Sequence, residues 1–172
     1  MNIEPLTGNQ IEFIRQVRND SKVNRWLASP SMPISAEDQE RWFDWYLNQG
    51  DMRRFVASVK GNPVGYGLIK SIDQIHRSAE VGLCIASEHW GKGYGKRLLE
   101  WLVERVLVTL NFHRCWLDTF ADNERAICLY ERVGFQCEGT LRENRLKNGR
   151  YRDSIVMSIL DREWKVGLSD KT

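Results

Sequence analysis

Three glycines stand within five positions of the run HWGKGYGKRLL, directly before an amphipathic helical pattern. They are Gly91, Gly93 and Gly95, with Lys92 and Lys96 among them. The first backbone N–H groups of a helix have no partner within the helix, and the helix dipole adds partial positive charge there. Glycines let an anion approach these groups closely, so the run predicts a phosphate-binding loop. A tight strand-to-helix turn is the alternative that needs no ligand.

The spacing of these glycines excludes two common phosphate motifs. The run has the form G-x-G-x-G, whereas dinucleotide-binding folds use G-x-G-x-x-G. No Gly-Lys-Ser or Gly-Lys-Thr closes the loop, so it does not fit a Walker loop either. A third kind of phosphate cradle is therefore required.

A tyrosine on a later helical segment is the second group that could do chemistry. NERAICLYERVGF predicts a helix of about ten residues that ends at Gly134, with Asp122 or Asn123 as its cap. Tyr130 lies in this helix, and a phenol with a pKa near 10 stays protonated at pH 7, as a general acid must. Because Ile127 lies on a neighbouring turn, Tyr130 also suits a core aromatic.

Composition bounds the class of protein. The 172 residues, 42% of them hydrophobic, suit one domain over 1–172. The net charge is only +2, so no global field predicts a nucleic-acid or membrane partner. No apolar run is long enough for a bilayer and no signal-peptide pattern is present, so we expect a cytoplasmic protein. The four cysteines lack zinc-ligand spacing, so we expect reduced thiols and no metal.

Hydrophobic periodicity predicts the elements that position these groups. Helical spacing follows Asn9, a predicted N-cap, and aromatic residues recur in a later helix. From Arg54 the period changes to two, which predicts a hairpin and then a third strand, SAEVGLCIA. A helix over 93–110 and the strand RCWLDTF predict a parallel crossover, and an Asn-Gly pair at 148–149 predicts a C-terminal hairpin.

The glycine run, the motif DNERAICLYERVGF about 28 residues downstream, and this order of elements resemble the GNAT superfamily of acetyl-CoA-dependent N-acetyltransferases. The similarity covers roughly residues 3–160. It implies a single α/β (α+β) domain whose mixed, mostly antiparallel sheet is splayed at the acetyl-CoA site and flanked by helices on both faces. It also implies acetyl transfer to a primary amine by direct attack in a ternary complex. The loop departs from the family pattern at Trp90, where Gln or Arg is usual.

The resemblance implies roles for residues along this segment. The pantetheine arm of CoA is expected along the strand VGLCIA, where a bulge near 82–84 would free the N–H of Cys84 or Ile85 as an oxyanion donor. Asn123 matches a position that binds the arm, and Tyr130 matches the acid that protonates the departing thiolate. The residues expected to bind acetyl-CoA are Leu83, Cys84, Ile85, Trp90, Gly91, Lys92, Gly93, Tyr94, Gly95, Lys96 and Asn123.

The acceptor amine must lose a proton before it attacks. Glu80 is the candidate base, directly or through water, with His76 second; an ion-paired strand carboxylate is the alternative for Glu80. The aromatic helix ERWFDWYLNQ lies where the family builds its acceptor pocket. We therefore expect Trp42, Tyr46 and His76 to contact the acceptor, with core packing as the alternative for the aromatic residues.

The pattern is most similar to the branch that holds ribosomal-protein N-terminal, spermidine and nucleotide-linked amino-sugar acetyltransferases. The C-terminal hairpin carries five basic residues, Arg142, Arg145, Lys147, Arg150 and Arg152. They favour a nucleotide-linked amino sugar over a polycationic polyamine, with a protein N-terminus as the runner-up, whereas solvated hairpin charge is the interpretation without a ligand. A catalytically silent CoA-binding module is a further alternative, and the sequence leaves open whether two chains form a homodimer.

Overall fold

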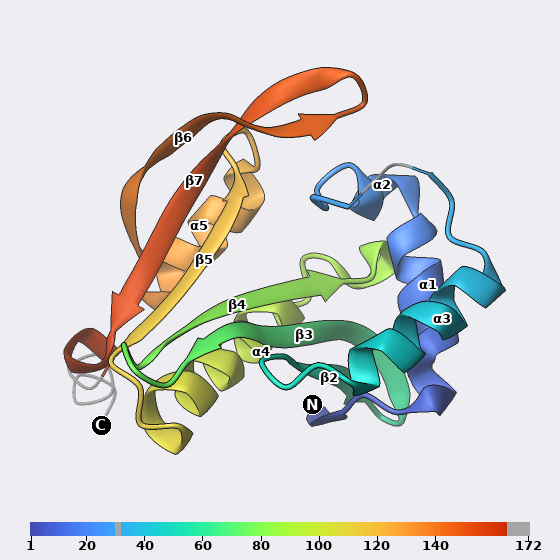
Figure 1. The fold of residues 1–172 in the computed structure, drawn as a ribbon, viewed down its shortest axis with the longest axis horizontal. Helices are drawn as coiled ribbons and strands as arrows, with labels where there is room; N and C mark the ends of the chain where they lie inside the picture. Colours follow the sequence, from blue (N-terminus) through green and yellow to red (C-terminus); the bar gives the residue numbers. More distant parts are fainter. Residues whose placement is uncertain (30–31, 165–172) are drawn as a thin grey trace.

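A computed structural model of the protein describes residues 1–29 and 32–164. Seven strands form one sheet in the order β1-β2-β3-β4-β5-β7-β6 (Figure 1). The strands are β1 Asn2–Pro5, β2 Arg53–Val59, β3 Asn62–Asp73, β4 Ser78–Ile85, β5 Arg114–Phe120, β6 Gln136–Lys147 and β7 Arg150–Leu160. Neighbouring strands are antiparallel except β4 and β5, which confirms the mixed sheet. The domain expected over 1–172 includes 30–31 and 165–172, which lie outside the described residues.

Helices cover both faces of this sheet, as predicted. They are η1 Gly8–Gln10, α1 Ile11–Asn19, α2 Ser21–Asn24, α3 Ala36–Leu47, η2 Ser87–His89, α4 Tyr94–Glu104, η3 Arg105–Thr109 and α5 Glu124–Val133. On one face Leu98 and Leu102 of α4 pack with Val81 of β4, and on the other Ile14 of α1 packs with Cys84 of the same strand. Successive β4 side chains thus alternate between two cores. Among the described residues, no helix is long and apolar enough to cross a membrane.

The parallel pair β4 and β5 is short, and this shapes the molecule. Only Ser78, Ala79 and Glu80 of β4 pair with β5. Beyond that point β4 stays with β3 as far as Ile85, whereas β5 stays with β7 along its whole length. The two halves of the sheet therefore diverge like the arms of a V (Figure 1). The predicted splay is confirmed.

Of the three helices whose ends were predicted, α5 has Asn123 as its cap and Gly134 after its last residue, as expected, whereas the other two differ in detail. The cap predicted at Asn9 is wrong, because Thr7 and Gln10 form a capping box around η1 and α1 begins at Ile11. The strand β1 was missed, since its four residues are too few for a clear period. The helix predicted over 93–110 begins as expected, but its last turn, η3, is a π-helix in which Leu110 N–H donates to the carbonyl of Arg105.

Turn chemistry followed the sequence closely at the C-terminal hairpin. Asn148 and Gly149 adopt positive φ angles of 51° and 75°, as a two-residue hairpin turn requires.

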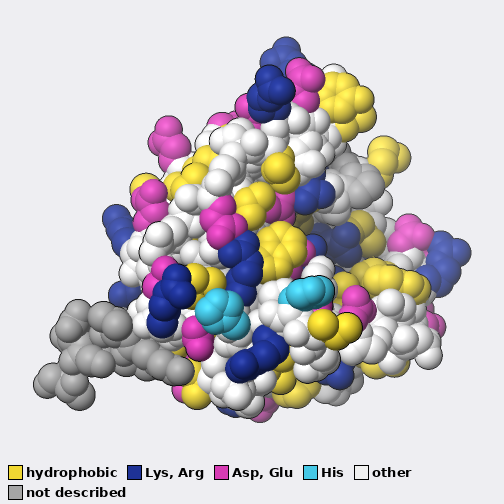
Figure 2. Space-filling model, turned by 60° about the vertical axis from the view of Figure 1, so that its left-hand side comes forward, with side chains coloured by type: hydrophobic (Ala, Val, Ile, Leu, Met, Phe, Trp, Pro, Cys, Tyr) yellow, Lys and Arg dark blue, Asp and Glu magenta, His cyan; other side chains and the backbone are white. Residues whose placement is uncertain are grey.

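On the face shown in Figure 2, basic and acidic side chains are interspersed with hydrophobic ones rather than gathered by sign. This arrangement agrees with the net charge of +2.

Candidate active site

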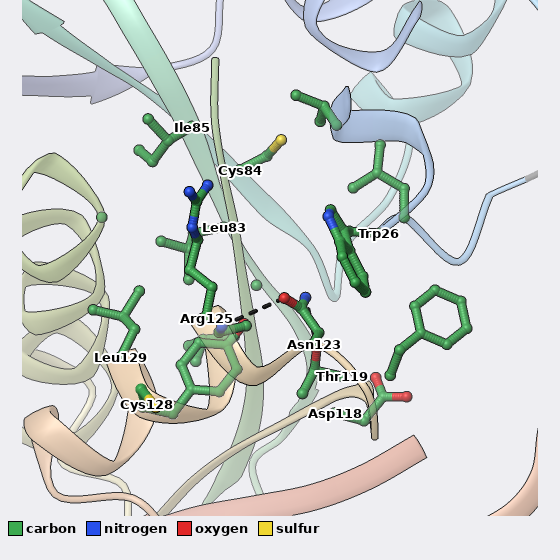
Figure 3. Close-up of a pocket in the computed structure, with 18 of the residues that line it drawn as sticks. Trp26, Leu83, Cys84, Ile85, Asp118, Thr119, Asn123, Arg125, Cys128 and Leu129 are labelled. Carbon is green, nitrogen blue, oxygen red and sulfur yellow. Dashed lines mark hydrogen bonds between the residues drawn. The ribbon is translucent and has the colours of Figure 1, made fainter. Parts of the chain in front are cut away.

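A cavity of about 990 Å³ opens where β4 and β5 diverge. Its walls come from α2, β3, β4, the glycine loop, the first turn of α4, β5, α5 and the β6–β7 hairpin. Figure 3 shows side chains of β4 and α5 directed into this space, with Trp26 on the opposite wall. Most of the residues expected to bind acetyl-CoA therefore line one cavity.

The free edge of β4 forms one wall of the cavity. Ala86 N–H donates to the Val64 carbonyl of β3 (3.0 Å), and hydrogen bonds alternate along an antiparallel ladder. The backbone groups of Leu83 and Ile85 therefore face the gap, while those of Cys84 face β3. The bulge predicted near 82–84 is wrong, because the β3–β4 register is continuous there and shifts only between Lys70 and Asp73. The splay alone exposes the polar edge, and Ile85 rather than Cys84 offers the N–H.

The glycine loop has the geometry that close approach of an anion requires. Gly91 and Gly93 have positive φ angles of 76° and 78°, and a Cβ atom on either would meet nothing within 4 Å. Gly93 is the N-cap of α4, so the N–H groups of the following first turn lack helical partners. Gly95 lies closer to the core, since a Cβ there would be 3.3 Å from Leu129. Open space beside unpaired N–H groups fits a diphosphate.

The Trp90 side chain is hydrogen-bonded to the end of β4. Its indole Nε1 donates to the Ile85 carbonyl at 2.8 Å, so it occupies the last carbonyl of the free β4 edge. Lys96 lines the cavity and lies 3.8 Å from Glu100. Lys92 is exposed, lies 3.3 Å from a His89 ring nitrogen and is not part of the cavity wall.

Tyr130 lies on α5 and lines the cavity while being only 8% exposed. Burial, and then the nearby Asp118 carboxylate, raise the pKa of its phenol well above the ordinary value. Asn123 is the N-cap of α5: its side-chain oxygen accepts from Ala126 N–H at 3.4 Å, drawn as a dashed line in Figure 3. Its amide also donates to Thr119 Oγ1 at 3.2 Å. The capping alternative for Asn123 thus holds, and the residue still faces the cavity.

Glu80 lines the cavity as an ion-paired carboxylate. It is 7% exposed, and its Oε1 lies 2.7 Å from Lys70 Nζ. Ser71 Oγ donates to Oε2 at 3.4 Å. Both carboxylate oxygens are therefore engaged within the protein, which matches the alternative considered for this residue.

The other residues expected at the acceptor site lie elsewhere. His76 is in the β3–β4 turn, exposed and 2.8 Å from Asp73, at the closed end of the β4–β5 pair. Trp42 and Tyr46 stack on each other in α3 with ring centroids 5.8 Å apart, and the Tyr46 hydroxyl accepts from Arg54 N–H. None of these three side chains lines the cavity. The α3 helix packs on α1, so Trp42 and Tyr46 face the core that contains Ile14.

Three of the five hairpin cations are engaged within the protein, whereas Arg142 and Arg150 are exposed, as the interpretation of solvated charge expects. Arg145 lies 2.5 Å from Asp118 of β5, and Arg152 pairs with Asp122 while its guanidinium lies 3.8 Å from the centre of the Phe120 ring. Lys147 is 4% exposed. Neither solvated charge nor a grip on a phosphorylated acceptor describes these three residues. The sequence contains the basic and acidic residues, but nothing in it matches one to another.

A buried lysine ties the hairpin to α2 and closes this part of the cavity. Lys147 Nζ donates to Asn24 Oδ1 at 3.0 Å and to the Ser29 carbonyl at 2.7 Å. Burial lowers the pKa of this amine. Trp26 and Leu27, just beyond α2, line the cavity beneath this contact. Sequence analysis did not foresee a wall from this segment.

A splayed edge beside a glycine loop defines a protein that binds acyl-CoA thioesters in an extended pose. Comparison with known proteins agrees with this class. Residues 19–135 match the model of the acetyltransferase (GNAT) family. The chain belongs to this family and is an acetyl-CoA-dependent N-acetyltransferase.

Individual relatives cover almost the whole chain. A spermidine N(1)-acetyltransferase of Vibrio cholerae is 31% identical over 95% of both chains. A Bacillus subtilis protein with the provisional name ribosomal N-acetyltransferase YdaF is 29% identical over 87% of this chain and 84% of its own. The crystal structure of a spermidine N-acetyltransferase from V. cholerae with CoA and spermine has a TM-score of 0.88, 30% identity, and covers 95% of this chain and 97% of that one.

Proposed function

We propose that the free edge of β4 holds the pantetheine arm of acetyl-CoA and that residues 91–96 hold its diphosphate. The observation that supports this most directly is that β4 keeps its ladder with β3 to Ile85 but loses β5 beyond Glu80. The backbone groups of Leu83 and Ile85 can then pair with the amides of the arm as a neighbouring strand would. The N–H of Ile85 is the donor we assign to the thioester carbonyl. Acetyl-CoA supplies the activated acetyl group.

Tyr130 is the general acid in this proposal. Its raised pKa keeps the phenol protonated at every physiological pH, so its O–H is present to hydrogen-bond the departing thiolate. The same shift makes the phenol a weaker acid, so we expect the proton to move only as negative charge develops on the sulfur. Asn123, at the start of the same helix, fixes the position of α5 beside β5 through Thr119. We assign it a second role as a hydrogen-bond partner of the CoA arm.

Deprotonating the acceptor requires free energy that the site must help supply. For an amine with a pKa near 10.4, loss of the proton at pH 7 costs roughly 4.6 kcal/mol. Glu80 is the candidate base, through a water molecule because Lys70 and Ser71 engage its oxygens. His76 has no comparable support, since it is remote from the cavity.

A polyamine such as spermidine is the acceptor that we infer first. Its support is that the relatives covering most of the chain bear the name spermidine acetyltransferase. The nucleotide-linked amino sugar favoured by the hairpin charge has no counterpart among those relatives. A second candidate, an acceptor with one amine and a neutral or anionic body, is favoured by a specific observation. Of the four carboxylates that line the cavity among the described residues, three are each paired with a cation of the chain, namely Glu80, Asp118 and Asp122, and Glu124 is the exception.

A panel of acceptors separates these candidates. Release of the CoA thiol is measured at fixed acetyl-CoA with spermidine, spermine, a UDP-linked amino sugar, amino acids and a peptide with a ribosomal-protein N-terminus. We expect the highest kcat/KM with spermidine. Rapid turnover of a single-amine acceptor combined with inert polyamines would reject the first candidate in favour of the second. Acetylation of the peptide alone would reject both.

A further inference from the structure

A single arginine extends from α5 to the tryptophan that begins the adjoining glycine loop. Arg125 is the second residue of α5 and lines the cavity. Its guanidinium carbon lies 4.2 Å from the centre of the Trp90 ring, and that ring is itself hydrogen-bonded to the end of β4 at Ile85. Figure 3 shows the Arg125 side chain extending from α5 toward β4. This positive charge beside the loop therefore comes from a residue of α5 and not from the loop itself.

Among the described residues, Arg125 and Arg132 are the arginines of the cavity without a carboxylate partner, and Arg125 is the one whose guanidinium lies on the Trp90 ring beside the loop. Lys70 pairs with Glu80, Arg145 with Asp118, and Lys96 lies near Glu100. Within 1–29 and 32–164, the contact of Arg125 is with the Trp90 ring and no carboxylate pairs with it. A guanidinium on an aromatic face keeps its planar N–H donors free for an anion.

The glycine loop has no free side-chain donor at position 90. Position 90 carries an indole whose only N–H is used by the Ile85 carbonyl, so the loop offers backbone groups and no side chain at this point. A diphosphate brings more negative charge than a helix N-terminus neutralises. A guanidinium can bind two phosphate oxygens in a bidentate manner.

We propose that Arg125, held on the face of Trp90, is the side-chain cation that binds the diphosphate of CoA. It supplements the backbone of residues 91–96 from the adjoining helix α5, whose Leu129 packs against Gly95 of the loop. Trp90 is the positioning residue, since its ring fixes the guanidinium beside the loop. The proposal rests on the assignment of this loop to the diphosphate.

The test measures binding rather than turnover. Dissociation constants for CoA, dephospho-CoA and S-acetylpantetheine are measured by calorimetry or competition for the wild type, Arg125→Met and the control Arg105→Met. Arg105 lies 4.8 Å from the ring centre of Trp101 in the same kind of contact, but neither residue lines the cavity. The control therefore removes the same charge and the same type of contact. Thermal unfolding checks that each variant is folded.

Arg125→Met is expected to weaken CoA and dephospho-CoA binding by the same factor, about 10- to 100-fold, and to leave S-acetylpantetheine binding unchanged. Arg105→Met should change none of the three. Unchanged CoA affinity in Arg125→Met would overturn the proposal. A loss for CoA but not dephospho-CoA would also overturn it, because the contact would then be with the 3′-phosphate.

Two further results keep this proposal separate from the proposed function. If the wild type binds no CoA at all, the assignment of the cavity fails and not only the role of Arg125. Trp90→Phe keeps an aromatic face but removes the indole N–H, and Trp90→Leu removes both. In a double-mutant cycle, the effect of Arg125→Met should shrink in the Trp90→Leu background and persist in Trp90→Phe. Equal effects in both backgrounds would reject Trp90 as the positioning residue.

Discussion

The two ends of the cavity are built in different ways. The donor end, formed by the β4 edge and residues 90–96, presents backbone groups from one continuous stretch of chain. The end that we assign to the acceptor, formed by β5, the β6–β7 hairpin and the segment around α2, presents side chains from segments far apart in sequence. Asp118 meets Arg145 there, and Asn24 meets Lys147. The donor end depends on backbone conformation, and the acceptor end depends on charge.

This difference bears on specificity. A backbone cradle tolerates many side-chain changes as long as the glycines and the strand ladder remain. Ion pairs between side chains can be exchanged without altering the fold, so acceptor preference can change among proteins that share the donor end. Relatives with names as different as spermidine and L-amino acid N-acetyltransferase fit this view. The predictions below change the residue between the two ends, then each end in turn, and finally an ion pair remote from both.

Tyr130 lies between the two ends, and its loss should have the largest effect. Tyr130→Phe keeps the buried ring but removes the proton donor, so we expect kcat to fall about 100-fold or more. The dissociation constant for CoA should stay within about twofold of the wild type. Because burial raises the pKa of Tyr130, the wild-type rate should not fall between pH 7 and pH 9.5 through loss of this proton. Thiol release and calorimetry give the two quantities, and an unchanged kcat would remove Tyr130 from the mechanism.

Gly93→Ala changes the donor end alone. The alanine must keep the backbone φ of 78° at this position, which costs about 1–2 kcal/mol. Its methyl group also points into the space that we assign to the diphosphate. We expect CoA affinity to fall at least tenfold while the KM for the acceptor changes little. Gly61→Ala is the matched control, since Gly61 has a φ of 80° and equally open surroundings in the β2–β3 turn. If both variants lose CoA affinity equally, backbone strain and not a blocked site is responsible.

Arg145→Met changes the acceptor end alone. It leaves the Asp118 carboxylate, 17% exposed, without its cation. A polyamine acceptor can then replace the lost charge, so we expect the KM for spermidine to fall by about fivefold, which corresponds to roughly 1 kcal/mol. An anionic acceptor should respond in the opposite direction. CoA affinity should not change.

Two control variants accompany this acceptor-end prediction. Arg150→Met removes an exposed charge from the same hairpin, outside the cavity, and should leave the KM unaltered. Arg145→Met with Asp118→Asn removes the unpaired carboxylate as well, which should abolish the gain with spermidine. A fall in KM that survives the second substitution would show that Asp118 does not face the acceptor.

The sequence predicted the donor end because its determinants are local. Helix caps, glycine spacing and alternation in β4 each depend on a few neighbouring residues, so the helix that begins after Gly93 could be anticipated. The splay was expected only from the resemblance to the GNAT family, and its start after Glu80 was not predicted. The bulge expected near 82–84 was wrong because the determinant in that case is not local. Whether an N–H is free depends on where the neighbouring strand departs, and pairing between β4 and β5 is not encoded within either strand.

The acceptor end could not be predicted because it is assembled by topology. Placing β7 between β5 and β6 brings Arg152 beside Asp122, 30 positions earlier, and brings Lys147 to Asn24, 123 positions earlier. Many basic residues could equally have been solvent-exposed. The aromatic helix containing Trp42 was assigned to the acceptor for the same lack of information, and tertiary packing against α1 places it in a separate core.

A third ion pair, remote from both ends, should affect stability and neither binding step. Glu138 of β6 accepts from Arg114 Nη1 at 2.5 Å and from Ser158 Oγ at 2.7 Å, and none of these residues lines the cavity. Mainly through Arg114, the pKa of Glu138 falls from 4.5 to about 2. A carboxylate whose pKa is lowered by folding stabilises the protein above its unfolded pKa and loses that contribution as the pH falls.

We therefore expect Glu138→Gln to lower the free energy of unfolding by about 1 kcal/mol at pH 7, because solvent screens a pair that is about a third exposed. The difference from the wild type should shrink as the pH falls from 4.5 toward 2 and should be smaller in high salt. Glu12→Gln is the control: its pKa is also about 2, but its pair with Arg15 is on the surface of α1, so the effect should be smaller. Urea denaturation at several pH values measures both variants. A change in spermidine KM in Glu138→Gln would contradict the view that acceptor preference depends only on charges within the cavity.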